Sequence, residues 1–156
     1  MTGSRPVDGA RPDGARPDEA TATRVWRGLR TLVLERNERR REVADALGMS
    51  FFRVKALRRI AAAPVTPGDL AADLMTDRPY VTLVVDDLAR RGLVERTPHP
   101  RDRRRKLLSV TPAGAAAAGE ADRILGTPPP GLVELDPEEL AALDRVVTKL
   151  LGPAQG

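Results

Sequence analysis

The sequence predicts a mainly α-helical protein that carries one small β-hairpin. From residue 19 onward, apolar residues recur at three- and four-residue steps over most of the chain, which is the pattern of amphipathic helices. Two short helical patterns follow each other between residues 66 and 92, with only a tight turn between them. A strongly basic segment comes next, in which two short runs of strand-forming residues flank a proline-containing tip.

The first helix of the close pair is expected to begin after Thr66, which can cap it, with Pro67 at the first helical position. Asp69 can bond back to the cap, like the acid of a capping box. We expect this helix to end near Met75. Because the turn that follows is so tight, the two helices must cross steeply, as in a helix-turn-helix.

The second helix of the pair is expected to run from its cap, Asp77, to Arg91, with Gly92 ending it. Its apolar residues have the i, i+3, i+4, i+7 spacing of a helix that is buried along one stripe: Val81, Val84, Val85 and Leu88. The residues on the opposite face are expected to point away from the core: Pro79, Thr82, Leu83, Asp86 and Arg90.

The basic segment is predicted to form a hairpin with strands at 94–97 and 106–110 and a tip at 98–102. Residues 94–106 contain six basic and two acidic side chains, a surplus of +4, which equals the net charge of the whole chain with its 26 basic and 22 acidic residues. Positive charge concentrated on a projecting hairpin beside an exposed helix face favours a polyanion as partner. Double-stranded DNA fits, because its major groove admits a helix.

Several runs of the chain resemble a known family: Leu70–Leu74, Val81–Leu88, Arg91–Arg96, Asp102–Lys106 and Val110–Gly114. The Asp-x-Arg element of Asp102 and Arg104, followed by the Thr-x-x-Gly step of Thr111 and Gly114, is a specific combination. By these motifs the chain resembles the MarR family of winged-helix transcriptional regulators, over roughly residues 42–126.

The resemblance implies a winged helix-turn-helix with a small β-hairpin wing and with N- and C-terminal helices that form a dimerisation bundle. It implies a homodimer that binds a pseudo-palindromic operator in double-stranded DNA as a sequence-specific transcriptional regulator, and we expect a repressor. Regulators of this family are often released by a small organic effector. Apolar faces on both flanking segments agree with a dimer, although the flanks could instead fold back on their own subunit.

We therefore divide the chain into four parts: a disordered tail rich in Pro and Gly at 1–18, dimerisation and scaffold helices at 19–63, the DNA-binding winged helix-turn-helix at 64–111, and C-terminal dimerisation helices at 112–152. The helical pattern continues from Glu19 to Leu47 without a proline. The last helix is expected to open with a capping box at Asp136, after a break that is rich in proline.

Arg104 is the first choice for a DNA contact, because the resemblance places this arginine at the wing, and Asp102 is expected to hold its guanidinium. Leu83 would suit a thymine methyl group, and Asp86 is expected to orient Arg90 rather than to bond a cytosine. The complete set of expected DNA-binding residues is Arg78, Pro79, Tyr80, Thr82, Leu83, Asp86, Arg101, Asp102, Arg103, Arg104 and Arg105. An effector is expected near residues for which core packing is an equal alternative: Trp26, Arg30, Phe51, Phe52 and Lys55.

Composition excludes several other classes of protein. The chain has no cysteine, so disulfides and thiolate metal sites are excluded, and its single histidine, His99, cannot build a zinc site. We expect no metal, no cofactor and no enzymatic activity, since phosphate loops and nucleophile motifs are absent. No apolar run approaches the roughly 18 residues of a membrane span, so we expect a cytoplasmic protein. The alternatives to an operator-binding regulator are a winged-helix protein of another regulator family and a module for protein or RNA contact without operator specificity.

Overall fold

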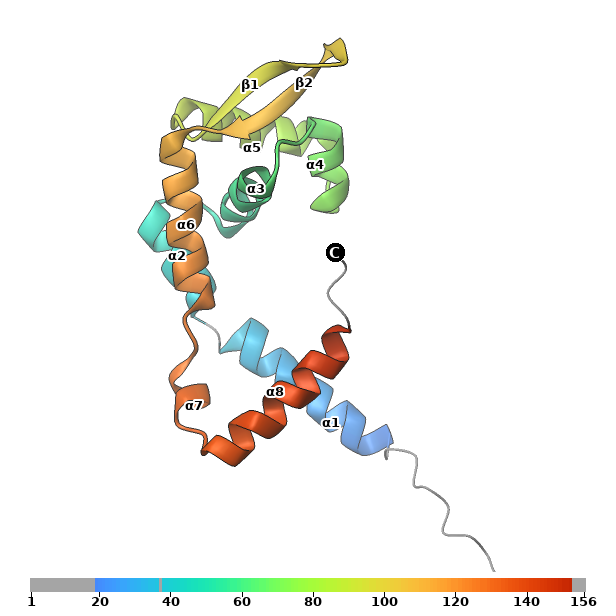
Figure 1. The fold of residues 1–156 in the computed structure, drawn as a ribbon, viewed down its shortest axis with the longest axis vertical. Coiled ribbons are helices and arrows are strands. Elements are labelled where there is room, and N and C mark those ends of the chain that lie inside the picture. Colours follow the sequence, from blue (N-terminus) through green and yellow to red (C-terminus); the bar gives the residue numbers. More distant parts are fainter. Residues whose placement is uncertain (1–18, 37, 153–156) are drawn as a thin grey trace, which may run out of the picture. The chain divides into compact units, whose positions relative to one another are not determined.

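The structure is a computed structural model that describes residues 19–36 and 38–152 (Figure 1). The tail expected at 1–18 lies outside the described residues. The described residues up to 36 and those from 38 onward fall into two compact units, which are described one at a time. Helices account for most of the described residues, and one antiparallel hairpin is present among them. The predicted fold class, mainly helical with a hairpin wing, is confirmed at this level.

The first unit contains the helix α1 (Glu19–Arg30) and a π-helical turn η1 (Thr31–Glu35). The amide of Arg36 donates to the carbonyl of Thr31 at 2.9 Å, which is the i to i−5 bond of a π-turn. The prediction of one helical stretch up to Leu47 was therefore wrong, because the next helix begins only at Arg39. Residues 35–42 contain no apolar side chain, so no packing holds a continuous helix across them.

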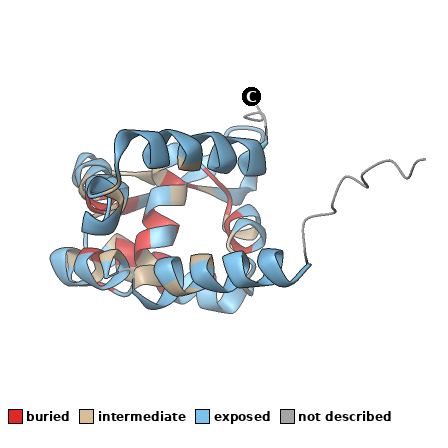
Figure 2. Ribbon diagram, turned by 90° about the horizontal axis from the view of Figure 1, so that it is seen from below, coloured by how far each residue is buried: buried red, intermediate tan, exposed pale blue. Residues whose placement is uncertain are grey.

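The core of the second unit is built by α2 (Arg39–Leu47), α3 (Phe51–Ala62) and α6 (Pro112–Gly126), which contact one another in pairs. Ser50 caps α3 by accepting a hydrogen bond from the amide of Arg53 at 3.4 Å. The buried core, coloured red in Figure 2, is aliphatic, and its largest fully buried members on these helices, on the helix pair and on the hairpin are Leu57, Ile60, Leu70, Leu88 and Leu108. This core supports the helix pair and the hairpin.

The helix pair consists of α4 (Pro67–Asp73) and α5 (Arg78–Arg90). The cap predicted at Thr66 is present, since its hydroxyl accepts from the amide of Asp69 at 3.2 Å. The same hydroxyl donates to the Asp69 carboxylate at 2.6 Å, so the acid bonds the side chain of the cap and not its backbone. Asp77 caps α5 as predicted, with its carboxylate accepting from the amide of Tyr80 at 2.7 Å.

The hairpin is formed by β1 (Val94–His99) and β2 (Asp102–Val110), which pair antiparallel from Val94 opposite Val110. Both strands are longer than predicted, because backbone pairing continues through exposed residues as far as Pro98 opposite Lys106, and a register shift follows. Backbone hydrogen bonds between strands do not require apolar side chains. The start of the exposed arginine run therefore does not coincide with the end of a strand. Val65 bonds Leu108 in both directions, at 3.1 and 2.8 Å, and ties β2 to the start of the helix pair.

After the hairpin, Thr111 connects β2 to α6 and to the end of α5. Its amide donates to the carbonyl of Leu93 at 3.1 Å, and its hydroxyl donates to the carbonyl of Gly92 at 2.6 Å. The hydroxyl also accepts from the amide of Gly114 at 3.0 Å, which is the helix cap predicted here. Gly114 lies so close to Leu93 that a Cβ atom would fall 1.9 Å from the Leu93 carbonyl oxygen. The Thr-x-x-Gly motif is thus the joint that fixes the wing to α6.

The C-terminal part of the second unit contains a short helix α7 (Pro130–Val133) and the helix α8 (Pro137–Leu151). The sequence had predicted only a break where α7 forms. The capping box predicted for α8 is present between Asp136 and Glu139. No residue of α8 is buried, and its apolar residues are exposed in the single chain: Leu140, Val146, Val147, Leu150 and Leu151. None of the helices in the described ranges has the length and apolar character needed to span a membrane.

Candidate nucleic-acid interface

The helix α5 has one side in the core and one side in solvent. The four residues of its predicted apolar stripe are all buried, with exposures of 1% or less: Val81, Val84, Val85 and Leu88. On the other side, Leu83 is 64% exposed. The hairpin lies beside α5, contacts it through β1, and extends away from the helices (Figure 1). An exposed helix side and a projecting wing therefore lie next to each other.

Two ion pairs tie the wing to the helix pair. Arg96 on β1 binds the carboxylate of Asp86 on α5. The guanidinium of Arg105 on β2 lies 3.7 Å from the Asp69 carboxylate and donates to the hydroxyl of Thr66 at 3.4 Å. The expectation that Asp86 orients Arg90 was wrong, because Arg90 pairs with Asp87 at 3.2 Å instead. One arginine of each strand is thus tied to a helix of the pair.

Four cationic side chains of the wing have no such partners. In the part of the chain that the structure describes, no acidic side chain forms an ion pair with the exposed residues Arg101, Arg103, Arg104 and Lys106. Their charge is fully available to a ligand, because neither a carboxylate nor burial opposes its approach. The wing therefore carries two arginines that are paired with acidic side chains and four cations that are not.

Asp102 shapes the tip of the wing in a way that was not expected. Its carboxylate accepts a hydrogen bond from the backbone amide of Arg104 at 3.0 Å, whereas we had expected it to hold the guanidinium. The imidazole Nδ1 of His99 accepts from the amide of Arg101 at 3.2 Å on the other side of the turn. Both side chains satisfy backbone groups of the tip, so they set the path of the chain and leave the arginine side chains free.

A cluster around Asp87 fixes α5 to the scaffold. The Asp87 carboxylate accepts from the Nε atoms of Arg91 and Arg53, both at 2.8 Å, and Arg91 also donates to the carbonyl of Gly48 at 3.1 Å. The pKa of the Asp87 carboxyl is held below its ordinary value of 3.8, first by the hydrogen bond from Arg91 and then by the charge of Arg91 and the interactions with Arg53. Partial burial of the carboxyl opposes this shift. Charged bonds therefore link α5 to α3 and to the turn before α3.

Comparison with known proteins identifies this arrangement. Residues 53–106, from α3 into β2, match the MarR family. The multiple antibiotic resistance protein MarR of Escherichia coli is 33% identical over 92 residues, which cover 58% of this chain and 64% of that protein. Over this region the chain is similar to the MarR family. An HTH-type transcriptional regulator of Mycobacterium tuberculosis is 35% identical over 96 residues, 61% of this chain and 66% of that protein. These matches span slightly less than two thirds of each relative.

Solved structures agree with this likeness. The crystal structure of wild-type MarR from E. coli in its apo form has a TM-score of 0.67 and 26% identity, and the likeness covers 82% of this chain and 97% of that one. A mutant of MepR from S. aureus shares the fold, with a TM-score of 0.71 at 21% identity, over 83% of this chain and 95% of that one. The winged-helix fold that the motifs implied is therefore confirmed.

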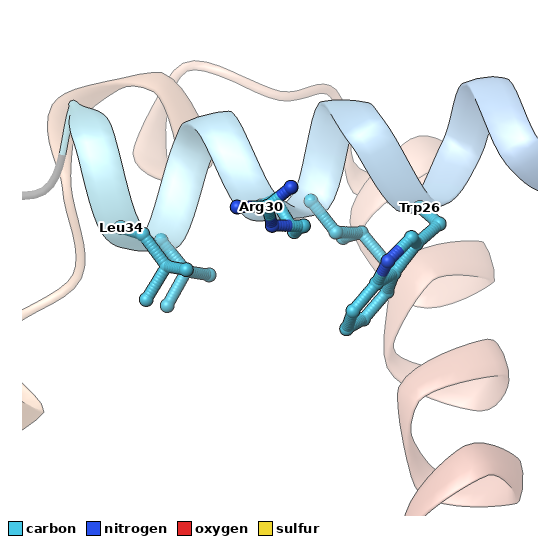
Figure 3. Close-up of a pocket in the computed structure, with 5 residues that line it drawn as sticks. Trp26, Arg30 and Leu34 are labelled. Atoms are coloured by element: carbon cyan, nitrogen blue, oxygen red, sulfur yellow. The ribbon is translucent and has the colours of Figure 1, made fainter.

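The residues expected to hold an effector are described in two separate units. Trp26 and Arg30 belong to the first unit, where they line a shallow hollow of about 300 Å³ together with Leu29, Val33 and Leu34 on the same helical segment (Figure 3). Figure 3 shows Trp26 and Leu34 projecting from one side of that segment.

The other three residues expected at the effector site, Phe51, Phe52 and Lys55, lie on α3 in the second unit. The Phe51 ring lies 4.9 Å from the guanidinium carbon of Arg40, and the Phe52 ring lies 4.9 Å from the ring of Tyr80. An effector site made by all five residues stays a prediction. No group of His, Asp and Glu side chains in the described ranges is suited to holding a metal ion.

Sequence reasoning missed three residues that position α5 and the wing. Arg53, Asp87 and Arg96 make the contacts that hold α5 and the wing. The adjacent acids at the end of α5 were the available signal, because two neighbouring carboxylates on a helix next to a basic hairpin require cationic partners. The pattern alone did not say which arginine each acid would bind.

Proposed function

We propose that this chain is a dimeric transcriptional regulator that binds double-stranded DNA with α5 and the wing formed by β1 and β2. The observation that carries the proposal is the division of the wing charge. Acidic side chains pair with Arg96 and Arg105, while no acidic side chain of the described residues pairs with Arg101, Arg103, Arg104 and Lys106. A helix in the major groove with cationic side chains on the flanking phosphates is the arrangement that such a surface supports.

The likeness to the MarR family supports the same function. The M. tuberculosis relative is named a transcriptional regulator. The structure of Streptococcus pneumoniae FabT, which shares the fold at a TM-score of 0.65 and 24% identity, is a complex with DNA. We propose by this likeness that the present chain acts as a repressor in the cytoplasm, on a pseudo-palindromic operator, and that a small organic effector releases it.

We further propose that two copies form a homodimer through the terminal helical segments. The exposed apolar residues of α8 described above support this, and the first unit has its own exposed apolar side chains, among them Val25, Trp26 and Leu32. Large exposed apolar faces on a monomer are unfavourable in water and favour association. Sedimentation or light scattering should find a dimer at micromolar concentration, and a monomer would contradict this part of the proposal.

The DNA-binding part is tested with Arg104→Ala. If the unpaired guanidinium contacts DNA, this substitution should weaken binding to a preferred duplex by about tenfold or more, since a charge-assisted bond is lost. It should also lower the slope of log K against log salt by about 0.9 for each phosphate contact removed. Thermal stability should change little, because the Arg104 side chain is exposed and has no ion-pair partner among the described residues.

Arg123→Ala is the matched control. It also removes one positive charge, but from a surface pair with Glu120 on α6, where the two side chains lie 2.6 Å apart. The control should keep the wild-type affinity and salt slope. If Arg104→Ala binds DNA as well as Arg123→Ala does, the wing is not the DNA contact and the proposal is wrong.

A further inference from the structure

Two polar side chains on the exposed side of α5, Thr82 and Asp86, are already engaged within the protein. The hydroxyl of Thr82 donates to the carbonyl of Arg78 at 3.0 Å, so its hydrogen is used and only its lone pairs remain for a ligand. The carboxylate of Asp86 is bound by Arg96. Neither side chain is free to donate a hydrogen bond to a base.

The guanidinium of Arg78 is also turned away from the middle of the helix side. It lies across the first turn of α4, where a Cβ atom on Gly68 would fall 2.8 Å from its terminal nitrogen. The absence of a side chain at Gly68 leaves the space that this guanidinium fills. Arg78 is therefore placed at the edge of the helix pair, where it suits a phosphate better than a base.

Leu83 is the most exposed large apolar side chain of α5. It is 64% exposed, whereas the valines that follow it at 84 and 85 are each 1% exposed. The fold gains almost nothing from an isolated apolar side chain in water, since its stabilisation depends on the apolar area that is removed from water. Leu83 thus stands near engaged polar groups, on a helix that contacts the wing through β1.

The charge around Leu83 indicates what covers it. Unpaired cations on the neighbouring wing suit a polyanion, so the occupant is the DNA of the proposed function and not an apolar protein surface. In the major groove, the apolar group that a base edge offers is the C5-methyl of thymine, whereas the other groups are hydrogen-bond donors and acceptors. An exposed leucine therefore has a chemically matched partner there.

We propose that Leu83 is a specificity-determining residue that contacts the C5-methyl group of a thymine in each half of the bound site. This inference rests on the proposed function, and it adds how the protein would recognise one base of the DNA sequence. On this account α5 recognises the base by apolar contact, while the wing and Arg78 position the helix through phosphates. Loss of one methyl contact should weaken binding by about fourfold, the factor that corresponds to one buried methylene-sized group.

The test uses the full chain and a duplex selected from random sequences. Each thymine of that duplex is replaced in turn by deoxyuridine, which lacks the methyl group and keeps the same hydrogen-bonding groups. When one thymine of a symmetry-related pair is replaced, the wild-type protein should bind the duplex about fourfold more weakly. When both thymines of the pair are replaced, binding should be about 15-fold weaker if the two contacts are independent. Leu83→Ala should bind the thymine and deoxyuridine duplexes equally at that position.

Val133→Ala is the control. It shortens another exposed apolar side chain, 69% exposed, on α7 outside the helix pair and the wing. This variant should discriminate between thymine and deoxyuridine as the wild type does. Thermal unfolding of both variants should match the wild type, because neither side chain contributes to the buried core.

The outcomes separate this inference from the proposed function. If wild-type protein selects a duplex but tolerates deoxyuridine at every position, or if Leu83→Ala keeps the discrimination, the assignment of Leu83 is overturned while DNA recognition stands. If no duplex is selected over random sequence, the proposed function itself fails, and the inference fails with it.

Discussion

Replacing Gly114 by alanine is expected to destabilise the fold by about 1–3 kcal/mol. The added Cβ would lie 1.9 Å from the carbonyl oxygen of Leu93 and 2.8 Å from its carbonyl carbon, where real Cβ atoms keep at least 3.0 Å. Backbone at the start of α6 must therefore move by more than an ångström. That movement acts on the bond from the Thr111 amide to the same Leu93 oxygen, now 3.1 Å long.

The magnitude follows from three contributions. Overpacking against a rigid neighbour costs about 1–3 kcal/mol, and losing or stretching the Thr111 bond costs about another 1 kcal/mol. The better helix propensity of alanine offsets about 1 kcal/mol. Because the displaced element is the joint between the wing and α6, the variant should also bind DNA more weakly.

Gly119→Ala provides the comparison. Gly119 lies on the exposed side of the same helix, and a Cβ atom there would meet nothing within 4 Å. This substitution should stabilise the protein by up to about 1 kcal/mol through helix propensity alone. Urea unfolding of both variants, with equal m-values, measures the difference. If Gly114→Ala proves as stable as Gly119→Ala, the close approach at Leu93 does not exist as described.

Two further predictions concern the helix pair. Met75 follows α4 with a φ of 51° and is 92% exposed. Met75→Gly should therefore relieve left-handed strain and raise the free energy of unfolding by up to about 1 kcal/mol. A less stable variant in urea unfolding would show that the strain is absent. The pKa of the Asp87 carboxyl is lowered, chiefly by the hydrogen bond from Arg91. The stability that the ionised carboxylate contributes is therefore fully present above about pH 4, the pKa of an unfolded aspartate. It is lost as the pH falls through the lower pKa of the folded state. Asp87→Asn should therefore be less stable than wild type at pH 7, with the difference shrinking below pH 4, and a difference that does not depend on pH would contradict the role of the ion pairs.

The fold could be predicted where a local signal decides the structure. The caps at Thr66, Asp77 and Thr111 and the stripe of α5 involve residues at most a few positions apart, so the sequence carries them directly. The break before Arg39 could not be predicted from periodicity, because it depends on the absence of packing partners around residues 35–42.

The candidate site was predicted in its location and only partly in its contacts. Leu83 was expected to be exposed on α5, and it is. The partner of Asp86 was chosen by helical spacing, as Arg90, whereas the structure brings Arg96 to it across the turn into β1. Asp102 likewise bonds the nearby backbone of Arg104, because a short side chain reaches an amide two residues away more easily than it reaches a long guanidinium. Such choices depend on three-dimensional placement.

The central claim is that α5 and the wing recognise one DNA sequence in preference to others. The most direct measurement is competition for a labelled, selected duplex by unlabelled DNA of random sequence, at a stated salt concentration, because affinity without the salt has no meaning for such a complex. The account predicts that the selected sequence competes about 10³-fold or more better than random DNA. Equal competition by the two DNAs would contradict it.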